Sequence, residues 1–184
     1  MRIREHKGTT KDGSRILIRS LTEQDAEAVL EHLRQSFLET EYLSKYEDEM
    51  DMTQESERKF LKILEEGEMT LMLGAFESGE LAATVSLIPI SALSKMKHRG
   101  GLGISVKKRF WGRGIGNLLL QVILAEAKWA GYEQVELEVV SENERAVRLY
   151  EKSGFAAYGR RPCAVKLRDG RYMDEILMYV QLHR

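Results

Sequence analysis

Cysteine, histidine and proline are scarce in this chain, and each shortage excludes a class of protein or site. The 184 residues include one cysteine, Cys163, so there can be neither an intrachain disulfide nor a zinc site built from several thiolates, and we expect Cys163 to be a packing residue. The two prolines, Pro89 and Pro162, mark no linker, which predicts a single domain over residues 1–184. The histidines lie far apart, without the spacing of metal ligands: His6, His32, His98 and His183. The sequence therefore predicts one domain that needs no metal.

Long apolar runs are also missing. No stretch approaches the ~18 apolar residues that a membrane-spanning helix needs. The first residues, MRIREHKGTTKDG, lack the apolar segment of a secretory signal. We expect a cytoplasmic protein with no membrane partner.

An excess of charge of either sign is absent as well. The chain has 28 basic and 29 acidic side chains and a net charge of -1, which argues against a generic nucleic-acid partner. The distribution is nevertheless uneven. Residues 95–113 hold seven basic side chains and no acid, and residues 39–57 hold eight acids and one lysine. Such blocks are often only solvated faces; the alternative is that one docks an anion and the other a cation.

The pattern of apolar residues predicts a mixed α/β (α+β) domain. A capping box of Thr22 with Asp25 begins the first helix, and Ser141 with Glu144 forms a second capping box. The expected helices cover 22–37, 55–65, 115–130 and 141–153, and the expected strands cover 15–19, 70–76, 81–90, 96–106, 134–140, 155–167 and 172–182.

The strongest local signal is the glycine-rich segment GISVKKRFWGRGIG, residues 103–116. A strand ends near Val106, and Gly112, Gly114 and Gly116 lead into the helix that begins at Ile115. Glycines allow positive φ and can bring several N–H groups onto one point. The helix N-terminus adds a partial positive charge and Arg113 a full one, so the turn predicts a phosphate site; a simple tight turn is the alternative.

Two common phosphate-binding motifs do not fit this segment. A Walker A loop needs Gly-Lys-Ser/Thr at its end, and none is present. The dinucleotide fingerprint G-x-G-x-x-G ends on Asn117 when counted from Gly112 and on Leu119 when counted from Gly114. A dinucleotide-dependent enzyme is therefore disfavoured.

The segment does resemble motif A of the GNAT superfamily of acyl-CoA-dependent N-acetyltransferases, Gln/Arg-x-x-Gly-x-Gly/Ala. The motif falls on residues 111–116, with Trp111 where the family has Gln or Arg; a register two residues earlier, Arg109 to Gly114, fits literally but leaves Gly116 unexplained. The resemblance implies that acetyl-CoA is the cosubstrate. It also implies a cofactor site made of a phosphate-binding turn and a strand end that pairs with the pantetheine amides: Trp111, Gly112, Arg113, Gly114, Ile115 and Gly116 in the turn, and Ile104, Ser105 and Val106 in the strand.

A second segment, NERAVRLYEKSGF at residues 143–155, resembles the second family signature, Asn-x-x-Ala-x-x-Leu-Tyr-x-x-x-Gly-Phe, at every defined position. Asn143 and Tyr150 are seven residues apart, so they share one helix face about 10 Å apart. The resemblance implies that Asn143 binds the pantetheine and that Tyr150 faces the thioester sulfur. It covers residues 15–182 and implies a mostly antiparallel, twisted sheet that is splayed at the cofactor site and flanked by helices.

Acetyl transfer to an amine sets the roles expected of these residues. The amine attacks only when neutral, so a carboxylate must accept its proton, and the departing thiolate benefits from an acid. Tyr150 fits the acid, and Glu138, on the strand before the second signature, fits the base. Two other interpretations stay open: Tyr150 as a packed aromatic residue, and Glu138 with its neighbour Glu136 as a solvated strand edge.

The acceptor is the least defined part of the prediction. In similar proteins the region of residues 39–57 walls the acceptor site, so its acids favour a cationic acceptor such as a polyamine, an amino sugar or a protein amine. A non-catalytic acyl-CoA-binding module is the alternative to an N-acetyltransferase. Exposed strands near the C-terminus would allow a homodimer.

Overall fold

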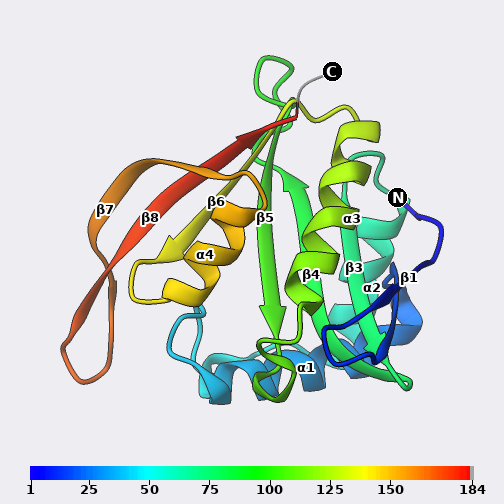
Figure 1. Cartoon of the computed structure of the whole chain (residues 1–184), viewed down its shortest axis with the longest axis horizontal. Coiled ribbons are helices and arrows are strands. Elements are labelled where there is room, and N and C mark those ends of the chain that lie inside the picture. Colours follow the sequence, from blue (N-terminus) through cyan, green and yellow to red (C-terminus); the bar gives the residue numbers. More distant parts are fainter. Residues whose placement is uncertain (183–184) are drawn as a thin grey trace.

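One eight-stranded sheet runs through the molecule in the order β1-β2-β3-β4-β5-β6-β8-β7 (Figure 1). The computed structural model describes residues 1–182. Every neighbouring pair of strands is antiparallel except β5 and β6, which are parallel. The strands are β1 (His6–Thr9), β2 (Arg15–Ser20), β3 (Leu71–Glu77), β4 (Glu80–Pro89), β5 (Arg99–Val106), β6 (Gln134–Val140), β7 (Ala156–Lys166) and β8 (Tyr172–Gln181).

Helices cover both faces of this sheet (Figure 1). They are α1 (Ala26–Glu39), α2 (Gln54–Glu66), α3 (Ile115–Trp129) and α4 (Glu144–Lys152), with single 3-10 turns η1 (Glu23–Asp25), η2 (Glu47–Glu49) and η3 (Lys108–Phe110). The apolar stripe of α3, with Ile115, Leu119 and Ile123, packs in the larger core cluster together with Tyr150 of α4. A second cluster holds Val29 of α1 and Leu61 of α2. None of the helices in residues 1–182 combines the length and the apolar character that crossing a membrane requires.

The sheet is splayed between β5 and β6, as the family resemblance implied. The two strands pair only from Arg99 opposite Gln134 to Gly101 opposite Glu136. At this closed end Arg99 forms a bidentate ion pair with Glu136. Beyond it, β5 stays paired with β4 and β6 with β8, so the two strands diverge. The gap between them lies beside the N-terminus of α3 and beside α4.

Three details differ from the expectations. The short strand β1 was not predicted, and β5 begins at Arg99 because residues 96–98 form a turn closed by a hydrogen bond from the Arg99 N–H to the Met96 carbonyl (3.1 Å). The predicted Ser141 cap of α4 is wrong. Asn143 is the N-cap, and its side-chain oxygen accepts from the Ala146 N–H (3.2 Å), whereas the Ser141 hydroxyl donates to Glu142.

Candidate functional site

A cavity of about 1140 Å³ occupies the gap between the diverging strands. Its walls come from the end of β5, the glycine turn before α3, the first turns of α4, the end of α1 and strands β6 to β8. The cavity brings together every residue that the sequence analysis proposed for the site: Ile104, Ser105, Val106, Trp111, Gly112, Arg113, Gly114, Ile115, Gly116, Glu138, Asn143 and Tyr150. Residues from four separate elements therefore meet at one place.

The glycine turn presents the N-terminus of α3 to the cavity. Gly112 has φ +78° and Gly114, the N-cap of α3, has φ +94°, a conformation that other residues rarely adopt. The first N–H groups of α3 lack intrahelical partners and carry the positive end of the helix dipole. A Cβ on Gly116 would lie 3.0 Å from the Leu149 side chain, so Gly116 lets α3 and α4 approach closely. This contact accounts for the glycine that the earlier motif register left unexplained.

Arg113 lies in this turn, but its side chain has a different role from the expected one. Its guanidinium pairs with Asp12 and Glu77 and donates to the Ser14 hydroxyl (2.8 Å). These contacts hold the pKa of Arg113 above its ordinary value and that of Asp12 below it. Arg113 thus ties the glycine turn to the β1–β2 turn and to the end of β3, and its charge is neutralised there rather than left for a phosphate.

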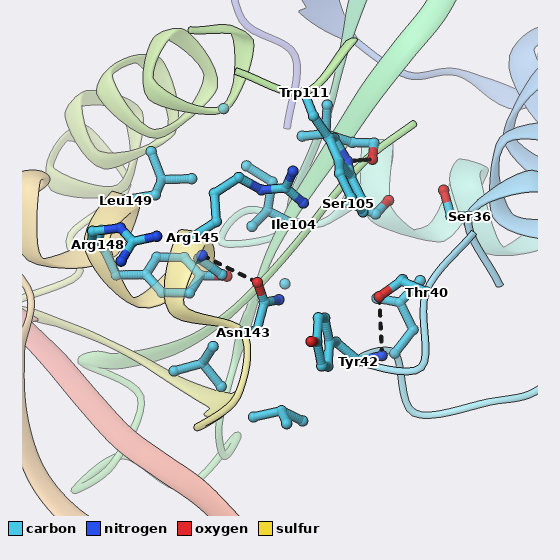
Figure 2. Close-up of a pocket in the computed structure, with 18 of the residues that line it drawn as sticks. Ser36, Thr40, Tyr42, Ile104, Ser105, Trp111, Asn143, Arg145, Arg148 and Leu149 are labelled. Carbon is cyan, nitrogen blue, oxygen red and sulfur yellow. Dashed lines mark hydrogen bonds between the residues drawn. The ribbon is translucent and has the colours of Figure 1, made fainter. Parts of the chain in front are cut away.

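Two basic side chains that the sequence did not single out lie closer to the cavity. The Lys11 N–H donates to the Arg113 carbonyl (3.0 Å), and the Lys11 side chain passes within 4 Å of the Cβ position of Gly114. The Arg145 guanidinium stacks on the Trp111 ring, 3.3 Å from its centroid (Figure 2). The Trp111 indole N–H donates to the Val106 carbonyl (2.6 Å). The Arg145 guanidinium therefore lies on Trp111, at the motif position where the family has Gln or Arg.

The basic block of residues 95–113 does not form the wall of the cavity as a whole. Among its seven basic residues, only Arg113 lines it. Several of the others are paired elsewhere: Arg99 with Glu136, and Lys107 and Arg109 with Glu80. The other basic residues that line the cavity come from distant parts of the chain: Lys11, Arg145, Arg148, Lys152 and Lys166.

Asn143 and Tyr150 face the cavity from α4. The Asn143 oxygen caps the helix, while its amide nitrogen points into the open space (Figure 2). Tyr150 is 6% exposed and packs edge-on against Phe155, with 5.7 Å between ring centroids. Burial raises the pKa of Tyr150 above its ordinary value, so the phenol stays protonated at neutral pH. It can donate a proton or a hydrogen bond.

Glu138 lines the cavity from β6, and its neighbour Glu136 does not. Both carboxylate oxygens of Glu138 accept from Arg161 of β7 (2.7 and 2.9 Å), and Arg161 also binds Glu175 of β8 (2.6 Å). This pairing lowers the pKa of Glu138, so the carboxylate is ionised at neutral pH. Glu136 instead binds Arg99 at the closed end of the sheet. The structure thus distinguishes Glu138 from Glu136, which the alternation of side chains had placed on the same face of the strand.

Three acids of residues 39–57 pair with arginines of the turn between β7 and β8: Glu41, Asp48 and Glu49. In the β7–β8 turn, Arg168 pairs with Asp48 and lies 4.0 Å from the centroid of the Tyr46 ring, and its N–H donates to the Tyr46 hydroxyl (3.0 Å). Arg171 pairs with Glu41. We call these contacts between residues 41–48 and the β7–β8 turn the clasp. It lies next to two stretches that line the cavity, residues 42–44 and residues 164–166 at the end of β7.

The remaining candidates give no further site. Within residues 1–182, no group of three or more histidine, cysteine or acidic side chains is arranged to hold a metal ion, and His183 lies outside the described residues. The expectation that Cys163 packs inside is wrong: it is an exposed free thiol at φ +50°. Its backbone N–H donates to Asp174 (2.8 Å), which holds the chain in that conformation.

Comparison with known proteins decides the family. The sequence profile of the acetyltransferase (GNAT) family matches residues 27–155. The chain belongs to the GNAT acetyltransferase family. A GNAT-family acetyltransferase from Streptococcus pneumoniae is 30% identical to it, with a TM-score of 0.87 over 91% of this chain and 99% of that chain. The yncA protein of Salmonella typhimurium, solved with its cofactor acetyl-CoA, has the same fold at 20% identity, with a TM-score of 0.81 over 92% of this chain and 95% of that chain.

Two curated relatives with acetyltransferase names match part of the chain. The L-amino acid N-acetyltransferase AaaT of Escherichia coli (strain K12) is 28% identical over 92 residues, which is 50% of this chain and 56% of AaaT. YwnH of Bacillus subtilis (strain 168) is 28% identical over 101 residues, 55% of this chain and 62% of YwnH. Both matches span less than two thirds of the relative's own length.

Proposed function

We propose that the chain is an acetyl-CoA-dependent N-acetyltransferase that moves the acetyl group directly to a primary amine. The observation that carries this proposal is the single cavity in the splayed sheet. It joins an N–H-rich helix terminus to a buried phenol and an ionised carboxylate. Acetyl-CoA would use both parts of this site. Its phosphates would lie at the helix terminus, and its thioester would lie near the phenol and the carboxylate.

The cofactor would lie along the gap between β5 and β6. The N–H groups of residues 111–116 would bind the phosphates, and the Ile104–Val106 backbone would pair with the pantetheine amides, with Asn143 donating to them from α4. Arg145, held on Trp111, would supply positive charge that the Trp at this motif position does not. We propose these as the binding roles of the residues that line the cavity.

The chemistry would proceed by attack of the neutral amine on the thioester carbonyl. A backbone N–H of the splayed strand end would stabilise the oxyanion. Glu138 would attract the acceptor ammonium and serve as the carboxylate base, and Tyr150 would protonate the departing thiolate. The high pKa of Tyr150 is suited to this role, because the phenol is protonated whenever the thiolate leaves.

The acceptor is best sought among small primary amines. The name of AaaT, an L-amino acid N-acetyltransferase, favours L-amino acids. Polyamines, amino sugars and a peptide N-terminus complete the panel because of the acids around the cavity. The edge strand β7 would allow a homodimer, which sedimentation analysis would test.

The first experiment is thermal unfolding with acetyl-CoA, CoA, NADH or ATP in excess. A ligand at 100 times its Kd adds about 2.7 kcal/mol, which raises Tm by roughly 5–10 °C for a chain of this size. A shift with acetyl-CoA and CoA alone supports the proposal and leads to the amine panel, assayed by release of free thiol. Binding without turnover on any amine would favour the acyl-CoA-binding module. If neither acetyl-CoA nor CoA raises Tm, the cofactor assignment is overturned.

A further inference from the structure

A buried histidine lies directly behind the cavity wall. His32 of α1 is fully buried, and its Nε2 lies 2.6 Å from the Ser105 hydroxyl oxygen. Ser105 lines the cavity from β5, on the side nearest to Ser36 of α1 (Figure 2), and its hydroxyl also contacts that of Thr84 at 3.0 Å. The distance between Ser105 and His32 is within the range of a hydroxyl and its general base. The roles proposed for the site so far leave this pair without a function.

The surroundings of His32 keep the imidazole neutral. Burial and the positive charge of Lys107 lower the pKa of His32 to about 4, and the Leu81 carbonyl and Glu39 only partly oppose this. Nδ1 is buried and forms no hydrogen bond. A neutral ring carries one proton, and in the tautomer with that proton on Nδ1 the Ser105 hydroxyl donates to Nε2. Nε2 is then free to accept the proton of the Ser105 hydroxyl.

We propose that Ser105 and His32 form a proton relay that accepts the amine proton during acetyl transfer, an inference that rests on the proposed function. The amine nitrogen forms its bond to the acetyl carbon and becomes positively charged. Its proton passes to the Ser105 oxygen while the Ser105 hydroxyl proton passes to Nε2 of His32. Ser105 is the residue that touches the amine, and His32 acts through it.

The remaining steps balance the protons. The carbon–sulfur bond breaks as the oxyanion collapses, and the thiolate takes a proton from Tyr150. The imidazolium then returns its proton through Ser105 and the cavity water to the Tyr150 oxygen. The products are the amide and CoA, and every side chain ends as it began. Buried beside Lys107, the imidazolium gives its proton up readily, which suits a transient carrier.

In this proposal the relay replaces Glu138 as the proton acceptor and leaves Glu138 the role of attracting the acceptor ammonium. Both oxygens of Glu138 are occupied by Arg161, so that carboxylate is well placed to attract an ammonium and poorly free to take its proton. Nε2 of His32 has no cation bonded to it; its neighbours are the hydroxyl groups of Ser105 and, at 3.5 Å, Ser36. Glu138 of β6 would therefore bind the acceptor ammonium, and Ser105 of β5, together with His32, would accept the proton.

The test uses Ser105→Ala, His32→Gln and the double variant. Glutamine can keep a hydrogen bond to Ser105 but is not a base, so it separates proton acceptance from packing. The variants are compared with the unaltered chain by kcat/KM from pH 6 to 10, with acetyl-CoA and the best acceptor from a panel of L-amino acids, spermidine, glucosamine and a short peptide. CoA binding and thermal unfolding are measured for each. Ser36→Ala is the matched control, because it removes a hydroxyl near the same imidazole nitrogen and leaves the relay intact.

We expect each single variant to lower kcat/KM at pH 7 by ten- to a hundredfold with an unchanged Kd for CoA. The deficit should shrink toward pH 10, where hydroxide replaces the relay, and the double variant should lose no more than either single one. A loss that is constant with pH, losses that multiply in the double variant, or a His32→Gln profile like that of the unaltered chain would each overturn the relay alone. No turnover by the unaltered chain on any amine would overturn the proposed function, and the relay with it.

Discussion

At the scale of single residues, local environment decides what each polar group in the cavity can do. Tyr150 and Glu138 are both ionisable, but burial keeps the phenol protonated and Arg161 keeps the carboxylate charged. The pair thus presents one donor and one anion at neutral pH. Opposite shifts of neighbouring acids are a common feature of acid–base sites.

Tyr150→Phe tests the acid at this scale. Removing the hydroxyl should lower kcat ten- to a hundredfold with little change in Kd for CoA, because the ring still packs on Phe155. Because the pKa of Tyr150 is raised, the unaltered chain should show no alkaline loss of kcat below pH 10 that depends on Tyr150. Steady-state kinetics of both chains between pH 7 and 10 measures this. Equal kcat values would mean that the phenol is only a packing residue.

His32 predicts a pH dependence of stability. Its pKa is about 4 in the folded chain and 6.5 when unfolded, so between these values the unfolded chain binds a proton that the folded chain does not. Stability therefore falls as pH drops from about 6.5 to 4, by up to roughly 3 kcal/mol. Urea unfolding at pH 7 and pH 4.5 measures the loss, which should be smaller in His32→Gln than in the unaltered chain. An equal loss in both would show that other groups cause it.

The residues that the sequence proposed for the site line one cavity, but their contact partners were not predicted. The two signatures placed Asn143, Tyr150 and the glycine turn because each needs a fixed local conformation or spacing, and these are written in consecutive residues. Arg145, Lys11 and His32 matter through contacts with residues distant in the chain. Arg113 was expected at the phosphates because a sequence shows its charge but not the acids that neutralise it.

At the scale of elements, the apolar pattern of the sequence predicted the helices and most strands, but it did not fix where each one ends. The stripe of α3 and the β7–β8 hairpin follow from periodicity, which repeats over many residues. The cap of α4 was misplaced by two residues because serine and asparagine both cap helices, and only the geometry shows that Asn143 takes the position. From the sequence, the acids of residues 39–57 could be interpreted only as a solvated face or as a wall that attracts a cationic acceptor, because the arginines that pair with Glu41 and Asp48 lie more than 100 residues later.

Gly114→Ala tests the turn that begins α3. An alanine at φ +94° is strained, so we expect a loss of about 1–2 kcal/mol in stability and a weaker affinity for CoA as the N–H groups move. Gly13→Ala is a matched control, since Gly13 also has positive φ with open space around it but lies outside the cavity. Chemical unfolding and CoA titration compare the two. A similar weakening of CoA binding in both variants would contradict a local role for Gly114.

The acidic segment beside the clasp can be tested by neutralising three of its acids together, with Glu47→Gln, Asp48→Asn and Glu49→Gln. Asp48 and Glu49 pair with Arg168, and Glu47 pairs with Arg34 of α1. We expect a higher KM for the acceptor and an unchanged KM for acetyl-CoA, because the acids hold the segment that walls the acceptor end and add to its negative charge. Stability should barely change, since exposed ion pairs contribute little. Glu55→Gln, which breaks an ion pair with Lys59 on α2, is the control. An unchanged KM for every acceptor would remove the acidic segment from the acceptor site.

At the scale of the whole molecule, the sheet consists of two antiparallel runs of strands. Strands β1 to β5 form one antiparallel run and β6 to β8 another, and only the short parallel pairing at Arg99–Gly101 connects their ladders. The order of the helices and all strands except β1 could be predicted from the sequence. The divergence itself could be predicted only by resemblance, because no local pattern reports where two strands stop pairing.

This divergence leaves backbone groups at the end of β5 and along β6 without a neighbouring strand on the side of the gap. An extended chain with amides of its own, such as pantetheine, would act there as a temporary extra strand that bridges the two halves. Binding would then make the two parts of the sheet open and close more cooperatively. Amide hydrogen exchange should slow at residues 104–106 and 137–140 together when CoA is added, so that two half-sheets open and close as one.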